Sequence, residues 1–308
     1  MTVAAGDGER AAYPLDVLVL GGVGVDTIVR VEQLPVPLAD TVHVPPMRRY
    51  VGHSGSGWAL GLHALGVRTH LLDLVGEDLE GGILRDRFAA VGLPFTGVVV
   101  QEGTKLSVNL VTPDGARTSF HDGRGQRLHP QDAGCHRALL GQSRHVHVTI
   151  NDWTRAAMRE ALADGRTVST DLNDWDGANP HHEEFAYAAD LVFVSAAALG
   201  DRGLAVADEI LRRGRASLVV VTAGAEGSMI VRRDLAPVGV AAAAVPGRPV
   251  IDTNGAGDAF GAGFLAAWLR GLPAELAARW GSLAGAWACG SAGTHADPID
   301  LSTLRSLL

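Results

Sequence analysis

Residues 251–271 read IDTNGAGDAFGAGFLAAWLRG, and this stretch decides the fold class of the chain. Its apolar residues recur at helical spacing: Phe260, Phe264, Ala267 and Trp268. Gly271 supplies a stop signal, and Pro273 lies just beyond it. Residues 254–258 are therefore predicted to form a loop of small residues that opens a helix.

The predicted loop has the chemistry of an anion hole. The first backbone N–H groups of a helix have no partner within the helix and lie at the positive end of its dipole. Because Gly255, Ala256 and Gly257 are small, a phosphoryl group can approach these N–H groups, which then stabilise its charge during transfer. The dipole is expected to favour the ionised form of Asp258, which could then accept a proton from an attacking hydroxyl. The alternative is that Asp258 only caps the helix.

Apolar runs alternate with helical patterns along the rest of the chain. Buried-strand patterns occupy residues 16–22, 70–76, 145–150, 167–172, 190–195 and 217–224, and helical spacing occupies residues 58–66, 81–92, 154–165 and 203–214. This alternation predicts an α/β fold with a parallel sheet that helices cover on both faces. The chain has 308 residues, 47% of them apolar, which is enough to bury such a core.

Two stretches, residues 38–51 and 96–121, break the alternation. Each reads as strands joined by turns, and Asp114-Gly115 is a hairpin signal. Together they predict a small β subdomain inserted in the α/β core. A lid, a surface hairpin and a dimerisation sheet are all compatible with this pattern.

The string DTNGAGDAFGAGF at residues 252–264 resembles the C-terminal signature of the PfkB/ribokinase family of carbohydrate kinases. The resemblance runs from Leu15 to about Asp297. It implies a single ribokinase-like kinase domain over residues 1–308, built as a three-layer α/β/α sandwich around a central, mostly parallel sheet. The two β stretches fall where that family inserts its small β-sheet lid.

The activity that the resemblance implies is ATP-dependent phosphorylation of a hydroxyl on a sugar or sugar-like small molecule. Asp258 matches the family's catalytic base, and the backbone of Gly255, Ala256 and Gly257 matches its anion hole. A nucleoside kinase of the same fold is one alternative. A protein that binds a sugar or nucleotide without turnover is the alternative from another class.

The expected substrate site departs from the family pattern. Asp26 lies in a stretch that resembles the family's first loop, whose aspartate binds sugar hydroxyls, and a carboxylate can accept two such donors. Residues 52–59, GHSGSGWA, resemble the family's GGxxxN-x-A segment. His53 replaces its second glycine, and Gly57 replaces the asparagine that usually contacts the sugar. Gly52, His53 and Gly57 are therefore expected to face a different ligand.

The expected nucleotide site follows another apolar run. Thr222, Gly224 and Gly227 resemble the family's TxGxxG turn, which lines ATP, and glycines there let the backbone approach the nucleotide. Asn254, just before the anion hole, is assigned to the nucleotide as well.

Mg²⁺ is the implied metal, but no ligand for it can be assigned with assurance from the sequence. The family's NxxE motif, which helps to organise Mg²⁺ and its waters, aligns here with Ser195 and Ala198, and neither supplies a carboxylate. Asp171 ends a predicted strand and could order a metal-bound water or a substrate hydroxyl, or could cap a turn. A monovalent cation beside the anion-hole loop, known in parts of the family, stays open.

Charge and hydropathy restrict the partners. The formal net charge is −8 and no block of Lys or Arg stands out, which argues against nucleic acid. There is no run of about 18 apolar residues, and the first dozen residues lack the apolar core of a signal peptide, so a cytoplasmic enzyme without membrane contact is expected. A homodimer through the lid sheet is compatible with the sequence, because exposed sheet edges attract partners.

Overall fold

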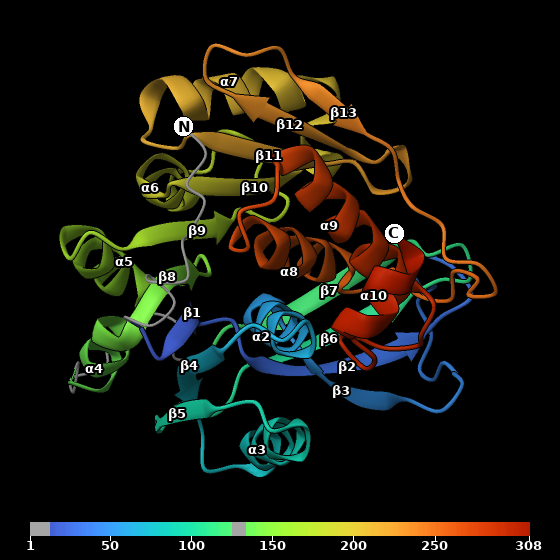
Figure 1. The fold of residues 1–308 in the computed structure, drawn as a ribbon. Helices are drawn as coiled ribbons and strands as arrows, with labels where there is room; N and C mark the ends of the chain where they lie inside the picture. The colour runs from blue at the N-terminus through green and yellow to red at the C-terminus, as the bar shows by residue number, and fades with distance from the viewer. Residues whose placement is uncertain (1–12, 125–133) are drawn as a thin grey trace.

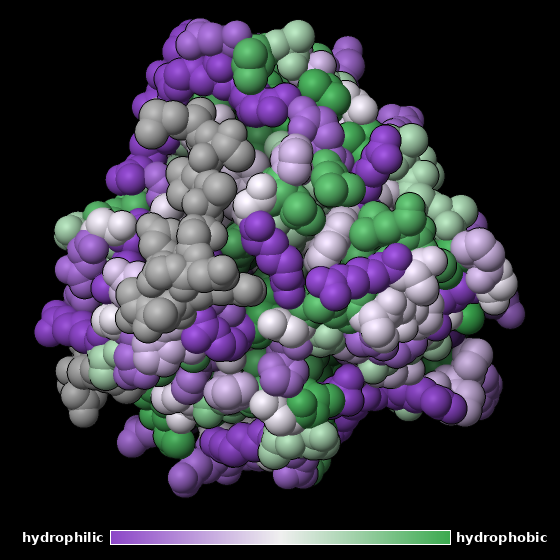
Figure 2. Space-filling view, in the orientation of Figure 1, coloured by the Kyte–Doolittle hydropathy of each residue, from purple (hydrophilic) through white to green (hydrophobic). Residues whose placement is uncertain are grey.

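The computed structural model describes residues 13–124 and 134–308. Residues 1–12, where the sequence lacks a signal-peptide core, lie outside the described residues. Among the described residues no helix is long and apolar enough to cross a membrane. Figure 2 shows hydrophilic and hydrophobic residues interspersed on one face of the molecule. The cytoplasmic location stays a prediction.

The centre of the fold is a nine-stranded sheet with the order β13-β12-β11-β10-β9-β8-β1-β4-β5 (Figure 1). Its strands are β1 (Leu15–Leu20), β4 (Thr69–Val75), β5 (Phe95–Val99), β8 (Ser143–Val148), β9 (Thr167–Asp171), β10 (Leu191–Ser195), β11 (Leu218–Thr222), β12 (Ser228–Arg232) and β13 (Val238–Val240). All neighbouring pairs among β5, β4, β1, β8, β9, β10 and β11 are parallel. Strands β12 and β13 add antiparallel pairs at one end. The prediction of a mostly parallel central sheet is confirmed.

Helices cover both faces of this sheet. One face carries α2 (Ser54–Ala64), α3 (Leu79–Val91), α8 (Ala256–Trp268), α9 (Ala274–Cys289) and α10 (Leu301–Leu307), and the other carries α4 (Gly134–Gln142), α5 (Thr154–Ala163), α6 (Pro180–Ala188) and α7 (Gly203–Arg213). Strand β1 shows why both faces need cover. Val17 and Val19 enter one hydrophobic core, and Leu18 and Leu20 enter the other, because side chains alternate along a strand.

A second, four-stranded sheet lies beside the core and corrects part of the sequence prediction. Its order is β3 (Arg48–Gly52), β2 (Gly24–Arg30), β6 (Leu106–Val111) and β7 (Arg117–Asp122). The hairpin at Asp114-Gly115 joins β6 to β7, and Gly115 takes a φ of +87°. Strand β2 was not expected in this sheet.

The boundaries of the two expected β stretches also change. Residues 96–99 pair in parallel with β4 at the edge of the large sheet, since a short run such as TGVV suits either sheet. Residues 38–47 contain no strand, in keeping with Pro45-Pro46, which has no N–H to donate to a ladder. Whether the small sheet acts as a lid stays a prediction.

Glycines bring α2 and α8 together below the small sheet. A Cβ atom at Gly61 of α2 would lie 2.7 Å from Cβ of Ala262, and one at Gly261 of α8 would collide with the indole ring of Trp58. Trp58 in turn stacks on His147 of β8, with ring centroids 3.7 Å apart. This close approach places the first turns of α2 and α8 next to each other, which builds the floor of the candidate site.

Candidate active site

Three carboxylates from distant parts of the chain come together. Asp26 lies in β2, Asp171 ends β9, and Asp258 lies in the first turn of α8. The charges of Asp171 and Asp26 both raise the pKa of Asp258. The guanidinium of Arg117, at the start of β7, lowers the pKa of both Asp26 and Asp258. The structure thus gathers three residues that the sequence predicted for the site and adds an arginine from the small sheet.

Asp26 is a buried carboxylate with 7% of its surface exposed. Its burial raises its pKa to about 6, although hydrogen bonds with Thr294 and Asn109 and the charge of Arg117 act the other way. Oγ1 of Thr294 donates to Oδ2 at 3.0 Å. A Cβ atom at Gly52, on the neighbouring strand, would collide with this carboxyl group. Gly52 therefore makes room for Asp26.

Asp258 does not behave as its place at a helix N-terminus suggests. Its side chain is 16% exposed, and burial raises its pKa well above the usual range, with Asp171 and Asp26 acting in the same direction. The expectation that the dipole sets the ionisation of Asp258 therefore does not hold, because desolvation and two like charges outweigh the dipole. A raised pKa brings a general base closer to the pH at which it works.

Asp171 joins the site and also holds a turn. Its Oδ1 accepts the backbone N–H of Asn173 at 2.8 Å, and Asn173 takes a φ of +52°. Burial raises the pKa of Asp171. The residue therefore caps a turn, as one alternative from the sequence had it, and its charge also acts on Asp258. A role in ordering a metal-bound water or a substrate hydroxyl stays a prediction.

His53 occupies a backbone conformation that favours glycine. It precedes α2 with a φ of +65° and makes no capping bond, which gives a physical reason for the glycine in the family segment that it resembles. Its Nε2 lies 3.1 Å from Oγ of Ser107 and 3.7 Å from Oδ1 of Asp26. Oγ of Ser107 also lies 3.1 Å from Nδ1 of His121, so a chain of polar groups runs from β2 to β7.

Burial keeps this histidine neutral. It lowers the pKa of His53 well below the usual range, and the nearby charges of Lys105, His121 and His295 act in the same direction. Lys105 itself is 2% exposed and forms a 2.7 Å ion pair with Asp73. The walls around Asp26 therefore offer neutral imidazoles and a hydroxyl.

Gly57 does not face open space. A Cβ atom at this position would collide with Cε1 of His295 and would lie 2.7 Å from Cβ of Asp258. The space that a side chain at position 57 would need is filled by the imidazole of His295.

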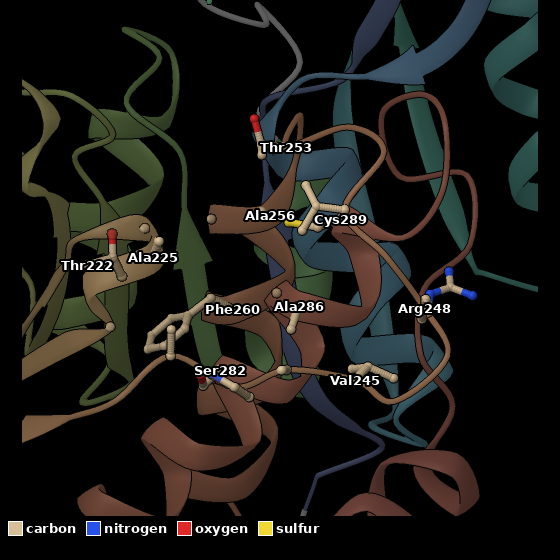
Figure 3. Close-up of a pocket in the computed structure, with 18 of the residues that line it drawn as sticks. Thr222, Ala225, Val245, Arg248, Thr253, Ala256, Phe260, Ser282, Ala286 and Cys289 are labelled. Atoms are coloured by element: carbon tan, nitrogen blue, oxygen red, sulfur yellow. Dashed lines mark hydrogen bonds between the residues drawn. The ribbon is translucent and has the colours of Figure 1, made fainter. Parts of the chain in front are cut away.

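A cavity of about 1000 Å³ lies beside the loop that opens α8, and Thr253, Ala256 and Gly257 are among its lining residues. Figure 3 shows Thr222 and Ala225 on one side of it and Ala286 and Cys289 of α9 on the other. Gly224 and Gly227, within and just after the 3₁₀ turn Gly224–Glu226, also line it.

Gly227 must be a glycine in this turn. Its φ is +96°, and a Cβ atom there would collide with the carbonyl oxygen of Val240. Asn254, which the sequence assigned to the nucleotide, lines a smaller cavity of about 370 Å³ beside the hairpin of the small sheet.

The loop that opens α8 turns at a glycine with a positive φ. Gly255 precedes α8 with a φ of +77°, and Ala256 and Gly257 line the large cavity. The N–H of Ala256 donates to the Thr253 carbonyl at 3.3 Å. The loop therefore presents the start of α8 to the cavity.

Two contacts tie this loop to the small sheet. Arg30 of β2 pairs with Asp252 at 2.6 Å, and Nη1 of Arg117 donates to Oδ1 of Asn254. Asp252 also accepts the N–H of Asn254 at 3.0 Å, which fixes the turn between them. The small sheet and the loop before α8 are therefore linked through these two side-chain contacts.

Metal ligands do not cluster in the described part of the chain. Across residues 13–124 and 134–308, no three His, Cys, Asp or Glu side chains are grouped to hold an ion. Ser195 lines the large cavity at the end of β10, and Ala198 is exposed.

The sequence reasoning missed three side chains of the site: Arg117, Thr294 and His295. Arg117 carried a signal that was not used, because it lies in a stretch expected to form the small sheet. Thr294 and His295 follow α9 in a segment without a local pattern, so only the tertiary structure reveals them.

This chain is similar to known proteins over most of its length. Residues 15–300 match the pfkB family carbohydrate kinase. The chain is 44% identical to an acarbose 7(IV)-phosphotransferase from Actinoplanes sp., over 94% of this chain and 97% of that protein. It is 31% identical to an ATP-dependent ribose-1-phosphate kinase from Halopiger xanaduensis, over 92% of this chain and 94% of that one.

A solved structure of a related kinase has the same fold. A microbiome-derived acarbose kinase, Mak1, superposes with a TM-score of 0.88 and 49% identity, over 95% of this chain and 98% of that chain. The alternative of a protein that binds without turnover is therefore not needed, and this chain belongs to the pfkB family of carbohydrate kinases.

Proposed function

We propose that this chain transfers the γ-phosphoryl group of ATP to a hydroxyl of acarbose or of a similar polyhydroxylated compound. The observation that carries the proposal is the group of three carboxylates, Asp26, Asp171 and Asp258, beside the neutral imidazole of His53. Carboxylates accept hydrogen bonds from hydroxyl groups and repel phosphates. The three carboxylates, which outnumber the single guanidinium of Arg117, thus favour a hydroxyl-rich substrate without a phosphate group over a sugar phosphate.

In the proposed reaction the substrate oxygen attacks the γ-phosphorus. The substrate O–H bond breaks and its proton passes to the Asp258 carboxylate. A bond forms between the substrate oxygen and phosphorus, and the bond from phosphorus to the β–γ bridging oxygen breaks, so that ADP leaves. The role of Asp258 rests on its place at the start of α8, where Gly257 lines the neighbouring cavity.

The large cavity is proposed to hold ATP. Thr222, Gly224 and Gly227 would line the nucleotide, and the N–H groups of residues 255–257 would stabilise charge on the transferring phosphoryl group. Mg²⁺ bound to the triphosphate would offset its charge. Mg²⁺ keeps several waters and usually needs only one or two carboxylates besides the phosphates. Asp171 is the proposed acceptor for a metal-bound water or a substrate hydroxyl.

The small sheet is proposed to act as a lid. It carries Asp26, Arg117 and His121, so its approach to the core would enclose the substrate. Its strands β6 and β7 also present an exposed cross-strand pair, Val108 at 38% and Phe120 at 59% exposure. We propose this pair as the centre of a lid-to-lid contact in a homodimer.

The test is an ADP-release assay with acarbose, simple hexoses and pentoses, ribose 1-phosphate and nucleosides. Acarbose is expected to give the highest kcat/KM, and Asp258→Asn is expected to lower kcat by at least about a hundredfold with little change in KM for ATP. The matched control is Asp208→Asn, an exposed carboxylate on α7, which should keep parental kcat. Preference for a nucleoside would replace the substrate assignment, and near-normal kcat in folded Asp258→Asn would refute the base.

A further inference from the structure

His295 is a histidine whose burial has no explanation in the reaction outlined above. Its side chain is 4% exposed, and its imidazole lies between the start of α2 and the anion-hole loop. A Cβ atom at Gly57 would collide with the ring, and one at Gly255 would lie 2.6 Å from its Cε1. Two glycines therefore leave the space that this one side chain fills.

The backbone of His295 is held in an uncommon conformation. Its φ is +52°, in the left-handed region that few residues other than glycine adopt, although asparagine, aspartate and histidine do so more often than the rest. The preceding residue, Thr294, donates its hydroxyl hydrogen to Asp26. The hydrogen bond from Thr294 thus fixes the segment that carries His295 to the proposed substrate site. The uncommon backbone conformation of His295 lies beside that site.

One ring nitrogen of His295 is satisfied and the other is not. A hydrogen bond to the backbone of His53 favours the protonated ring, so the acceptor is the His53 carbonyl. Nε2 is buried and has no partner, which assigns that hydrogen bond to Nδ1. Burial lowers the pKa of His295 to about 4, so the ring is neutral near pH 7 and Nε2 carries a lone pair.

The unpartnered nitrogen faces the proposed base. Nε2 lies 3.5 Å from Oδ2 of Asp258. Two acceptors at this separation gain no hydrogen bond while the carboxylate is ionised. Once Asp258 carries a proton, the carboxyl group becomes a donor and Nε2 is the acceptor beside it.

We propose that His295 is the positioning residue of Asp258: its ring fixes the side chain of the base, and Nε2 accepts the hydrogen bond of the protonated carboxyl group that the reaction forms. The ring can take this position because residue 57 is a glycine, since a Cβ atom there would collide with it. The inference rests on the proposed role of Asp258. It adds a residue that acts through the base.

Two matched substitutions test the inference. The amide of Gln reaches about as far as Nε2 and can offer an oxygen acceptor to Asp258, whereas the amide of Asn reaches only as far as Nδ1 and can keep the hydrogen bond to the His53 carbonyl. We expect His295→Asn to lower kcat by about 10- to 100-fold, the usual effect of losing such a supporting contact, with KM for ATP unchanged. His295→Gln should recover at least part of that loss.

Folding and catalysis are separated in the same experiment. Thermal melts of His295→Asn and His295→Gln show whether each variant is folded, because neither amide fills the space beside Gly57 and Gly255 as the ring does. Parental kcat in His295→Asn, or equal losses in both variants, would overturn the proposal and leave the kinase assignment intact. Normal kcat in Asp258→Asn, or no phosphorylation of any substrate by the parent, would instead refute the proposed function and this inference with it.

Discussion

Replacing Asp26 by asparagine is expected to stabilise the fold while it weakens substrate binding. Burial raises the pKa of Asp26 from its ordinary 3.8 to about 6. Near pH 7 the folded chain therefore holds an unfavourable buried charge. A pKa difference of about two units corresponds to about 3 kcal/mol, which is the upper limit of the stability that Asp26→Asn can add. Asparagine keeps an oxygen that can accept the hydrogen bond from Thr294.

The sign of the pH dependence follows from the direction of the pKa change. Because the folded pKa of Asp26 exceeds the unfolded one, the penalty is fully present above about pH 6, shrinks as the pH falls toward 3.8, and is absent below it. Urea denaturation of parent and variant at about pH 7.5 and about pH 4.5 measures this difference. The gain in free energy of unfolding should be large at the higher pH and small at the lower one.

A control with the opposite sign is available in the same chain. Asp300 caps α10 by accepting the N–H of Thr303, and hydrogen bonds from Ser302 and Thr303 lower its pKa to about 2. Asp300→Ala should destabilise the chain by a constant amount across both pH values, since its folded and unfolded pKa values lie below that window. A loss of stability in Asp26→Asn near pH 7.5, or a gain that does not shrink at lower pH, would refute the reasoning.

Three further predictions concern the substrate, the nucleotide and the metal. His53→Gly should relieve a strained φ of +65°, worth about 1 kcal/mol, and lower kcat/KM on the best substrate; a thermal melt and a substrate panel check both effects. Gly227→Ala should raise KM for ATP, as measured by an ATP titration, because its Cβ would collide with the Val240 carbonyl. Ser195→Asn with Ala198→Glu should lower the free Mg²⁺ needed for full kcat/KM at fixed Mg·ATP, and an unchanged Mg²⁺ curve would contradict it.

Six of the nine strands of the large sheet could be predicted, because β1, β4, β8, β9, β10 and β11 each overlap a mainly apolar run in the sequence. Strands β12 and β13 were not predicted. The small sheet was harder to delimit. Strand β2 carries Asp26 and Thr27 in its middle and follows Gly21-Gly22, so it reads as a loop. Residues 96–99 read like the strands of the small sheet, and only their pairing with β4 assigns them to the large one. Sheet membership depends on distant partners that a local pattern does not contain.

The candidate site divides along the same line. Asp258 and residues 255–257 are adjacent in sequence and share one helix terminus, so the sequence alone predicts that they act together. The sequence does not predict the pKa of Asp258. The pKa of Asp258 depends on Asp171 and Asp26, and its burial is a property of the packed fold. The sequence showed that position 57 has a glycine where the family has an asparagine. It could not show that the ring of His295 fills the vacated space, because His295 lies more than two hundred positions away.

Most of the residues with a strained backbone conformation lie at the candidate site. Four residues other than glycine have a positive φ among the described parts of the chain: His53, Asn173, Asp234 and His295. Asp234 lies in the turn between β12 and β13, and the other three border the carboxylates. Each such conformation costs about 1–3 kcal/mol and persists only where the surroundings hold it. Together with the buried charge of Asp26, this means that the site lowers the stability of the fold around it. Substitutions that relax the site should therefore raise stability and lower activity together, which is the pattern that the Asp26 and His53 variants test.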